Sequence, residues 1–409
     1  MEDSMTESHD TSGAGTRNCE WADDYDLFSL EFCTDPFSRW DAMRQGCPIA
    51  HSDRWGGSWM PVHYHDIRMI ARDSQRFSSR AVEVAGPIPE RGGGLIAPPL
   101  TSDPPAHSSH RSLLQPFFTP HKLAELEPFI RAEARSLVNA LTERGEGDVV
   151  EDFAEHLTIA VLAKILDVPR DNEQRFTDWV VRLVRIGPRD QAVRTAAVRE
   201  ILDYCDALLT ERRASPGDDL VSYLATAHID GQPLSRKHQL GSCFLILLAG
   251  ADTTWSAIGA SLWHLATHPE DRARLIAEPE LLSRAVEELL RAYAPVTVAR
   301  IAKQGVELHG RSIEAGERII LPLAAANRDP KQFVEPDVVK IDRTPNLHLT
   351  FGSGGHRCLG AGLATLELRV GLEEWMRVIP DFSLVDPENI RWSGGQVRGP
   401  EQVVFQVSK

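Results

Sequence analysis

The feature that most restricts the possible fold is a glycine-rich loop that ends in one cysteine, directly before a predicted helix. Residues 351–360 are FGSGGHRCLG, and the next fifteen, AGLATLELRVGLEEW, form a good helical pattern. Several backbone N–H groups and the positive end of the helix dipole would face the sulfur of Cys358, and both favour a thiolate. The glycines carry no side chain, so a flat cofactor can approach the loop, and Phe351 can cover the sulfur. A haem iron with an axial cysteine fits this chemistry.

The same segment resembles the haem-binding signature of the cytochrome P450 family, Phe-Gly-x-Gly-x-His-Arg-Cys-x-Gly, and matches every fixed position. The resemblance implies heme b (iron protoporphyrin IX) as the cofactor and Cys358 as its axial iron ligand. It also implies cofactor contacts at Phe351, Gly352, His356 and Gly360. The alternative is a free cysteine that packs as a small hydrophobe, and we expect this of the other five cysteines.

The resemblance runs from about residue 27 to residue 409, nearly the whole chain. It implies a mainly α fold with small β-sheets, in which a single triangular helical domain holds the haem between a long central helix and the cysteine loop. Residues 1–26 are largely polar and acidic and are predicted to form a disordered tail. We therefore expect one haem-thiolate monooxygenase domain over residues 27–409.

The first third of the chain predicts a small mixed region and a loop. Asp35 before a proline starts a capped helix over residues 36–45, and short extended pieces follow near 49–51 and 58–62. Residues 81–106 contain too many prolines and glycines for regular structure. They are predicted to be a long loop that forms part of a mobile lid.

The rest of the chain is predicted to be mostly helical. Apolar residues recur at three- and four-residue spacing over residues 121–213, as they do in packed amphipathic helices. Another helix is expected over about residues 278–292. After Pro295 and near the C-terminus, alternating apolar residues between turn glycines indicate short strands.

Residues 235–268 are predicted to form the longest uninterrupted helix, and its apolar run is broken by Gly250, Asp252 and Thr253. A glycine in mid-helix costs about 1 kcal/mol relative to alanine, and an unpaired buried carboxylate costs more. Gly250 would let a ligand lie close to the backbone, and the Thr253 hydroxyl can bond to the carbonyl of Ala249 and loosen the helix. A groove for dioxygen would result, with an acid and an alcohol beside it that can relay protons.

This interruption resembles the acid–alcohol pair of the cytochrome P450 family. The resemblance implies catalytic roles for Asp252 and Thr253, and cofactor contacts at Ala249 and Gly250. The plain alternative is a threonine that bonds back to its own helix within an ordinary core.

Glu288 and Arg291 lie three residues apart in the segment EELLR, where they can form an ion pair on one helix face. The simplest interpretation is an exposed pair that contributes little to stability. However, EELLR resembles the Glu-x-x-Arg motif of the family, which implies a structural brace completed by Arg343.

The two propionates of a haem need cationic or hydrogen-bonding partners if they are buried. By their place in the order of family motifs, the candidates are His107, Arg111, Arg300 and His356. By the same analogy, residues above the haem would contact substrate: Leu245, Leu248, Val296, Thr297 and Val298. These side chains are mostly aliphatic, so we expect a small or medium-sized, largely apolar organic substrate.

Composition excludes several other classes of function. The formal charge is -15 and no block of Lys and Arg is present, so no nucleic-acid partner is expected. The six cysteines lack zinc-finger or ferredoxin spacing, which is typical of a reducing compartment. The N-terminus does not resemble a signal peptide, and the longest apolar run, residues 244–251, is far short of the roughly 20 residues that cross a bilayer. We therefore expect a cytoplasmic protein without a membrane span.

Around residues 250–272 the chain looks like the haem domains of bacterial family members fused to a reductase, but it contains no reductase and no iron–sulfur cluster motif. The resemblance therefore implies dioxygen as co-substrate and, unless the sequence is a piece of a longer protein, a separate electron donor, a ferredoxin or flavodoxin with its NAD(P)H-dependent reductase. Two other functions stay open: oxidative coupling, cyclisation or peroxide-driven chemistry on the same scaffold, and a non-catalytic haem-thiolate sensor. A sensor would not need the acid–alcohol pair.

Overall fold

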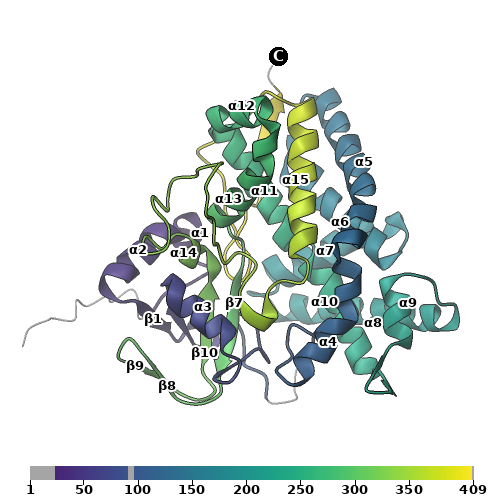
Figure 1. The fold of residues 1–409 in the computed structure, drawn as a ribbon, viewed down its shortest axis with the longest axis vertical. Coiled ribbons are helices and arrows are strands. Elements are labelled where there is room, and N and C mark those ends of the chain that lie inside the picture. The colour runs from purple at the N-terminus through teal and green to yellow at the C-terminus, as the bar shows by residue number, and fades with distance from the viewer. Residues whose placement is uncertain (1–23, 91–95, 408–409) are drawn as a thin grey trace, which may run out of the picture.

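The computed structural model describes residues 24–90 and 96–407. Figure 1 shows a roughly triangular molecule, with helices filling its top and right and a small sheet at its lower left. Most of the predicted tail, residues 1–23, and residues 91–95 of the predicted lid lie outside the described residues. The described part of the loop predicted over residues 81–106 has no helix or strand up to residue 105, as expected, and Ala106 begins the helix α4 (Ala106–Leu114).

The sheet has five strands in the order β1-β2-β10-β7-β3. Its central strand β10 is fully buried, because its apolar side chains pack into two core clusters: Ile320 into one, and Ile319 and Leu321 into the other. Ile319 lies opposite Trp59 in a parallel pair, and Ile320 lies opposite Ala299 in an antiparallel pair. The predicted extended pieces are confirmed as the first two strands. The strands are β1 (Ile49–Ser52), β2 (Ser58–Pro61), β3 (Phe77–Ser78), β7 (Thr297–Ala302) and β10 (Arg318–Pro322).

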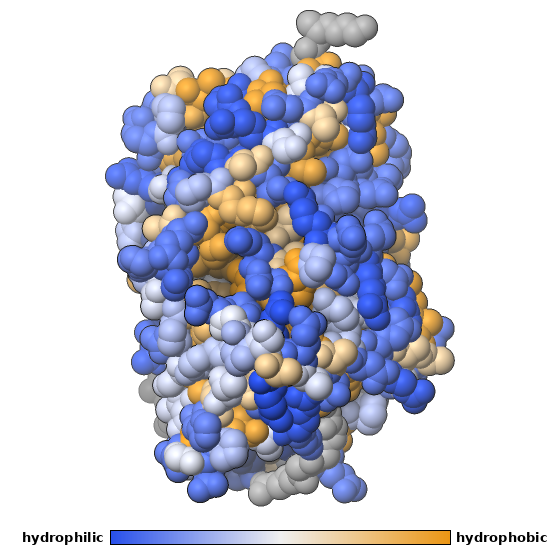
Figure 2. All heavy atoms as spheres, turned by 90° about the vertical axis from the view of Figure 1, so that its right-hand side faces the viewer, coloured by the Kyte–Doolittle hydropathy of each residue, from blue (hydrophilic) through white to orange (hydrophobic). Residues whose placement is uncertain are grey.

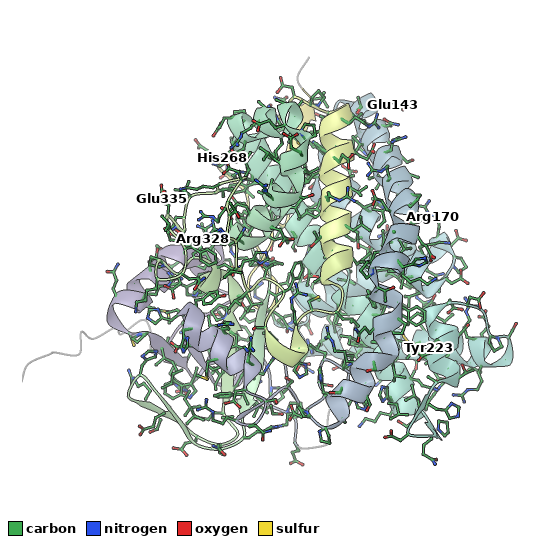
Figure 3. All side chains as sticks on the ribbon, in the orientation of Figure 1. Glu143, Arg170, Tyr223, His268, Arg328 and Glu335 are labelled. Atoms are coloured by element: carbon green, nitrogen blue, oxygen red, sulfur yellow. The ribbon has the colours of Figure 1, made fainter. Side chains whose placement is uncertain are left out.

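Short helices border this sheet. The capped helix is confirmed as α2 (Pro36–Gly46), because the Asp35 carboxylate accepts bonds from the backbone N–H groups of Phe37 and Ser38, both at 3.1 Å. The others are α1 (Leu30–Thr34), α3 (Tyr64–Arg72) and α14 (Leu323–Asn327). Arg328 joins this part to the helices, because its guanidinium lies 3.6 Å from the centre of the Phe37 ring and donates to the carbonyl of Ala292 (Figure 3).

The helical part contains the largest buried side chains, Trp179, Trp255 and Trp375. Its periodicity was predicted for residues 121–213 and is confirmed. The longest described helix is α5 (Pro120–Arg144), which runs beside α15 (Ala361–Val378) in Figure 1. Arg170, at the outer edge in Figure 3, ties α5 to α7 through ion pairs with Glu133 and Glu173. The remaining helices of this part are α4 (Ala106–Leu114), α6 (His156–Leu166), α7 (Glu173–Val180), α8 (Gln191–Ala214), α9 (Leu220–Thr226), α12 (Pro269–Ala277) and α13 (Leu282–Ala292).

Three further sheets are small. Strand β12 (Val404–Val407) pairs with β11 (Phe382–Leu384) and β4 (Glu146–Asp148), and this confirms the strand predicted near the C-terminus. The strands expected after Pro295 also include β8 (Val306–Leu308) and β9 (Arg311–Ile313), which form a hairpin. A last hairpin joins β5 (His228–Ile229) to β6 (Gln232–Pro233). The helix expected from about residue 278 begins later, because Pro279 opens a short 3₁₀ turn before α13.

The prediction of one uninterrupted helix over residues 235–268 is wrong. The chain forms α10 (Arg236–Ala249) and α11 (Asp252–Thr267), separated by Gly250 and by Ala251, whose ψ of -84° is not helical. The predicted cause is nevertheless confirmed, since the Thr253 hydroxyl donates to the carbonyl of Ala249 at 3.0 Å. A side chain that competes for a helix carbonyl favours a bend at that turn.

Taken together, α10 and α11 are the one stretch of described residues long and apolar enough to cross a bilayer. In the most apolar part of this stretch, 72% of the residues are buried inside the protein, as expected of a core helix. Polar side chains dominate the face shown in Figure 2, where apolar groups gather mainly in a hollow near the middle.

Candidate active site

The cysteine loop is a closed turn held by its own backbone. The N–H of Cys358 donates to the carbonyl of Phe351 at 2.8 Å, and the N–H of Gly352 donates to the carbonyl of Leu349 at 2.7 Å. Gly352 and Gly354 have φ values of 71° and 77°, which residues other than glycine rarely adopt. A Cβ atom at Gly354 would also lie 3.0 Å from Cα of Arg72 in α3. The glycines are therefore required by the turn itself and by its packing.

Cys358 differs from the other described cysteines, because its side chain is exposed, while Cys33, Cys205 and Cys243 are buried and Cys47 is intermediate. Burial nevertheless raises the pKa of Cys358, while the Gly360 N–H and the charges of Arg111 and Arg357 lower it. Both observations hold together if the sulfur faces an open space that the protein encloses.

The predicted preference for a thiolate is therefore only half right. The N–H bond and the cations act in the predicted direction, but burial outweighs them and the pKa of the thiol lies above its usual value. A metal ion bound to Cys358 would favour the thiolate, because a thiol that coordinates a metal is deprotonated.

One face of α10 and α11 is also partly open. Phe244, Ile246 and Leu247 are buried. Other side chains of the same stretch, three or four residues apart and so on one face of the helices, are partly exposed. These partly open residues are Leu245, Leu248, Ala249 and Thr253. From the sheet, Val296, Thr297 and Val298 are likewise half-buried, next to the buried Ala299 and Arg300. The residues predicted to contact substrate thus share the partial exposure of side chains that line a hollow.

Four basic side chains gather near the cysteine loop. The rings of His107 and His356 lie 4.1 Å apart, and the Nε2 atom of each is buried without a hydrogen-bond partner among the described residues. Burial, together with the charges of the neighbouring Arg300 and His107, lowers the pKa of His356 to about 3. Burial also lowers the pKa of Arg300 to about 10. Arg300 bonds the carbonyl of Ala299, and neither Arg300 nor Arg111 forms an ion pair with a described carboxylate.

Such a cluster needs anions, because buried cations and unpaired donors are unfavourable without them. Two carboxylates would satisfy His107, Arg111, Arg300 and His356 together. The exposed sulfur of Cys358, the side-chain-free turn and this cluster fit a haem with its two propionates.

The acid–alcohol pair lies at the break between α10 and α11. Asp252 is buried, and burial raises its pKa to about 6, against the charge of Arg185. Gly250 has a packing reason that the sequence did not predict: a Cβ atom there would lie 2.7 Å from the Leu162 side chain in α6. Glycine is thus needed at position 250 because α6 packs closely against the backbone there.

Two further charged residues near this pair were not predicted. Arg185 lies with its Nη2 atom 3.8 Å from Asp252 and 3.3 Å from the carboxylate of Glu155. The sequence offers one weak signal for each: a charged residue within a largely apolar helical run, in VVRLVRI for Arg185 and in FAEHL for Glu155. Their pairing could not be predicted, since the three residues are far apart in the chain.

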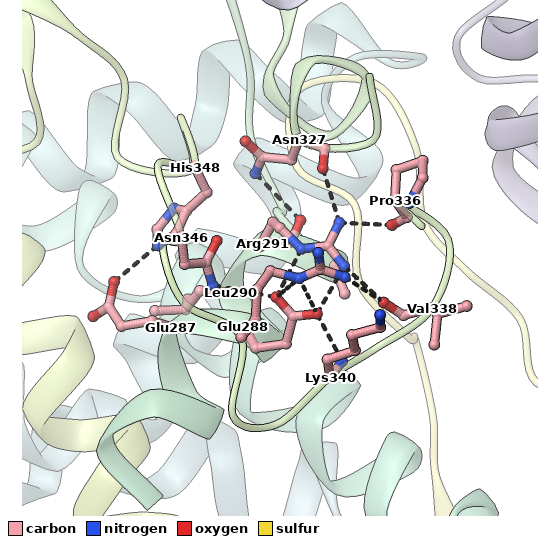
Figure 4. Close-up of polar contacts among 12 residues, drawn as sticks. Glu287, Glu288, Leu290, Arg291, Asn327, Pro336, Val338, Lys340, Asn346 and His348 are labelled. Carbon is pink, nitrogen blue, oxygen red and sulfur yellow. Dashed lines mark hydrogen bonds and ion pairs between the residues drawn. The ribbon is translucent and has the colours of Figure 1, made fainter. Parts of the chain in front are cut away.

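The predicted brace is present, and the alternative of an exposed pair is wrong. Glu288 and Arg291 are both fully buried and are joined by two bonds of 2.7 and 2.8 Å (Figure 4). Arg343 donates to both Glu288 oxygens at 2.9 and 3.0 Å. Burial would raise the pKa of Glu288, but the bonds from Arg291 and Arg343 and the N–H of Lys340 lower it overall.

Asn327, which the sequence did not single out, connects this brace to the cysteine loop. Its side-chain Oδ1 accepts a hydrogen bond from the backbone N–H of Leu349, and its side-chain Nδ2 donates one to the hydroxyl of Thr350. Its backbone carbonyl accepts a hydrogen bond from the guanidinium of Arg291. Leu349 and Thr350 directly precede Phe351, so the brace fixes the start of the loop.

Comparisons with known proteins agree with this arrangement. A family model described as cytochrome P450 matches residues 161–389. The chain is 37% identical to mycinamicin IV hydroxylase/epoxidase of Micromonospora griseorubida, over 84% of this chain and 88% of that protein. It is 35% identical to vitamin D(3) 25-hydroxylase of Pseudonocardia autotrophica, over 88% of this chain and 90% of that protein. The solved structure of the cytochrome P450 PksS of Bacillus subtilis 168, from its bacillaene polyketide synthase, matches with a TM-score of 0.85 at 30% identity, over 94% of this chain and all of that one.

Proposed function

This chain belongs to the cytochrome P450 family and is a monooxygenase, and we propose that it inserts one atom of dioxygen into a small or medium-sized, largely apolar organic substrate, with two electrons from a separate protein. The observation that carries this proposal is the partly open aliphatic face of α10 beside the Asp252–Thr253 pair. Such a face suits an apolar molecule and places it next to the acid and the alcohol.

Family members bind haem, and heme b is the form that we propose here. Cys358 would be the iron ligand, and His107, Arg111, Arg300 and His356 would hold the propionates. Phe351, Gly352 and Gly360 would line the loop beneath the cofactor, and Ala249 and Gly250 would face it from the other side. The sequence has no C-x-x-C-H motif for covalent attachment, which supports heme b. When bound, a thiolate-ligated haem supplies the activation of dioxygen.

Asp252 and Thr253 would manage protons at this site. A pKa of about 6 lets the buried Asp252 take up and release a proton near neutral pH. The Thr253 hydroxyl is held by the carbonyl of Ala249 and stays partly open to the enclosed space. The pair could therefore pass a proton from the buried acid to a group bound next to Thr253.

We expect Thr253→Ala to keep its haem content but to lose coupling, so that most reducing equivalents appear as hydrogen peroxide rather than product. The loss should be on the order of tenfold or more, since a positioned proton donor contributes about 10²–10⁴-fold. The measurement is product and peroxide formed per NADPH, with a surrogate ferredoxin and reductase and a substrate found by spectral screening. Thr253→Ser, which keeps the hydroxyl, should retain most of the coupling. Full coupling in Thr253→Ala would refute the proton role, and no substrate-dependent NADPH consumption by the wild type would favour the sensor.

For the electron donor we propose a ferredoxin or flavodoxin that docks over the cysteine loop. Arg68, Arg72 and Arg357 are exposed and form no ion pair with described residues. They line a depression of about 370 Å³ together with Gly352 and Ser353 of the loop. In a chain of net charge -15, this cationic patch suits an acidic partner.

We expect Arg68→Glu to slow electron transfer from an acidic ferredoxin by about tenfold at low ionic strength, because charge reversal weakens steering. The difference from wild type should shrink as salt is added. Stopped-flow reduction of the haem protein measures both effects. Arg199→Glu in α8 is the matched control, since Arg199 is also exposed and carries the same charge. Equal slowing by the two variants would argue against docking at the loop.

We further propose that residues 27–409 form one domain and that the protein works in the cytoplasm. The N–H of Gly395 donates to the carbonyl of Leu27 at 3.1 Å, which supports a single unit from the first described residues to the last strands. A partner that draws on NAD(P)H and cysteines that stay reduced support the location.

Oxidative coupling or cyclisation in secondary metabolism is a second candidate. A relative whose name refers to polyketide biosynthesis supports a place in secondary metabolism. The same haem and proton residues would serve it. Mass spectrometry of the product distinguishes the two, since coupling or cyclisation adds no oxygen atom.

A further inference from the structure

Two π-helical turns and the break between α10 and α11 lie next to one another beside Asp252. Residues 150–155 and residues 181–186 each form a π-helical turn, and α10 is separated from α11 at residues 250–251. Glu155 lies in the first turn, Arg185 lies in the second, and Asp252 directly follows the break. Arg185 contacts both of these acids. π-Turns are costly and are found frequently at functional sites.

The three side chains form a chain of charges with one cation between two acids. Nη2 of Arg185 is 3.3 Å from Oε1 of Glu155 and 3.8 Å from Oδ1 of Asp252. Both acids are buried, whereas the Arg185 side chain is 22% exposed. The Trp255 ring, 5.3 Å from the guanidinium, supports it from α11. One guanidinium cannot neutralise two buried carboxylates at once.

We propose that Glu155 is a positioning residue for the acid–alcohol pair: it shares Arg185 with Asp252 and thereby sets the pH at which Asp252 holds a proton. Glu155 itself need not touch substrate or cofactor. The electrostatic part of this proposal stands without the proposed function, and only its effect on coupling rests on that function.

The electrostatics of the two acids support such sharing. Burial, opposed by Arg185 and helped by the nearby carboxylates of Asp252, Glu151 and Asp148, raises the pKa of Glu155 to about 7. The pKa of Asp252, at about 6, lies in the same neutral range. When Glu155 is protonated and neutral, Arg185 interacts electrostatically with Asp252 alone, which favours the ionised form of Asp252. Loss of that proton draws Arg185 back and favours a proton on Asp252.

The test is a titration of the Asp252 carboxyl in the haem-loaded full chain, followed by infrared spectroscopy of its protonated C=O stretch. Asp252→Asn identifies the band. We expect Glu155→Gln, which removes one negative charge at constant shape, to lower the titration midpoint of Asp252 by about one pH unit, the size typical of a nearby charge. Glu151→Gln is the matched control, because Glu151 lies in the same turn, is exposed and forms no ion pair with described residues; it should leave the midpoint almost unchanged.

Arg185→Met gives the opposite sign. Without the cation, the midpoint of Asp252 should rise, since burial then acts alone. The pH optimum of coupled turnover should fall in Glu155→Gln in parallel with the infrared midpoint. An unchanged Asp252 midpoint in Glu155→Gln would overturn the proposal, whatever the activity. A shifted midpoint in an enzyme that never turns over would instead uphold the sharing of Arg185 and count against the proposed function.

Discussion

Cys358→Ala should abolish turnover and the thiolate-type absorption spectrum of the reduced carbon monoxide complex. The sulfur is the one side-chain group of residues 351–360 that can give a metal an anionic donor, since the loop contains no Asp or Glu. The basic residues that would hold the propionates, His107, Arg111, Arg300 and His356, remain in the variant. We therefore expect it still to bind haem, but more weakly than the wild type. Absorption spectroscopy of the purified, haem-reconstituted variant measures both effects.

Cys47→Ala is the control for this change. Cys47 is a half-buried cysteine outside the loop, and its sulfur only bonds the carbonyl of Ile49. This variant should keep the spectrum and the activity of the wild type. If Cys358→Ala kept an unaltered thiolate spectrum, another residue would have to hold the iron, and the assignment of the whole site would be wrong.

The features that the sequence predicted well depend on neighbours in the chain. The Asp35 cap, the bond from Thr253 to Ala249 and the turn that ends in Cys358 each span a few residues. Spacing alone decides whether such groups can meet. The fold class, mainly helical with small sheets, was also predicted, because the cysteine loop is specific to one family.

The features that the sequence did not predict depend on contacts between distant segments. Arg185 meets Glu155 and Asp252 only because three helices converge, and nothing local to any of them indicates the others. Gly250 is explained by Leu162, a residue of another helix. The pKa of Cys358 is a third example, since a local argument from N–H groups and a dipole omits burial, which depends on the whole fold.

Glu288→Ala should be the most destabilising change outside the site. Removing one partner from a buried ion pair costs about 3–5 kcal/mol, because the remaining charge stays buried without compensation. Here two arginines, Arg291 and Arg343, would lose their shared carboxylate. Arg291 also bonds the carbonyl of Asn327, whose side chain holds Leu349 and Thr350, so the loss should loosen the start of the cysteine loop and lower haem retention.

The measurement is the free energy of unfolding in urea, with haem content followed in parallel. Glu287→Ala, one residue away, is the control: it removes an ion pair with His348 in which Glu287 is 42% exposed, so its effect should be at most about 1 kcal/mol. Should Glu288→Ala not accumulate as folded protein, Glu288→Gln keeps the shape and allows the same comparison. A loss in Glu288→Gln no larger than that in Glu287→Ala would mean that the brace does not stabilise the fold.

The same carboxylate predicts how this stability depends on pH. Its pKa is lower in the folded protein than in the unfolded chain, so the folded state binds fewer protons at Glu288. The contribution of Glu288 is therefore complete above its unfolded pKa and is lost as the pH falls through the folded one. The difference in unfolding free energy between the wild type and Glu288→Gln should then narrow below about pH 4.5, the ordinary pKa of a glutamate. A difference that stayed constant down to pH 3, with both proteins still folded, would show that the charge on Glu288 is not what holds Arg291 and Arg343 in place.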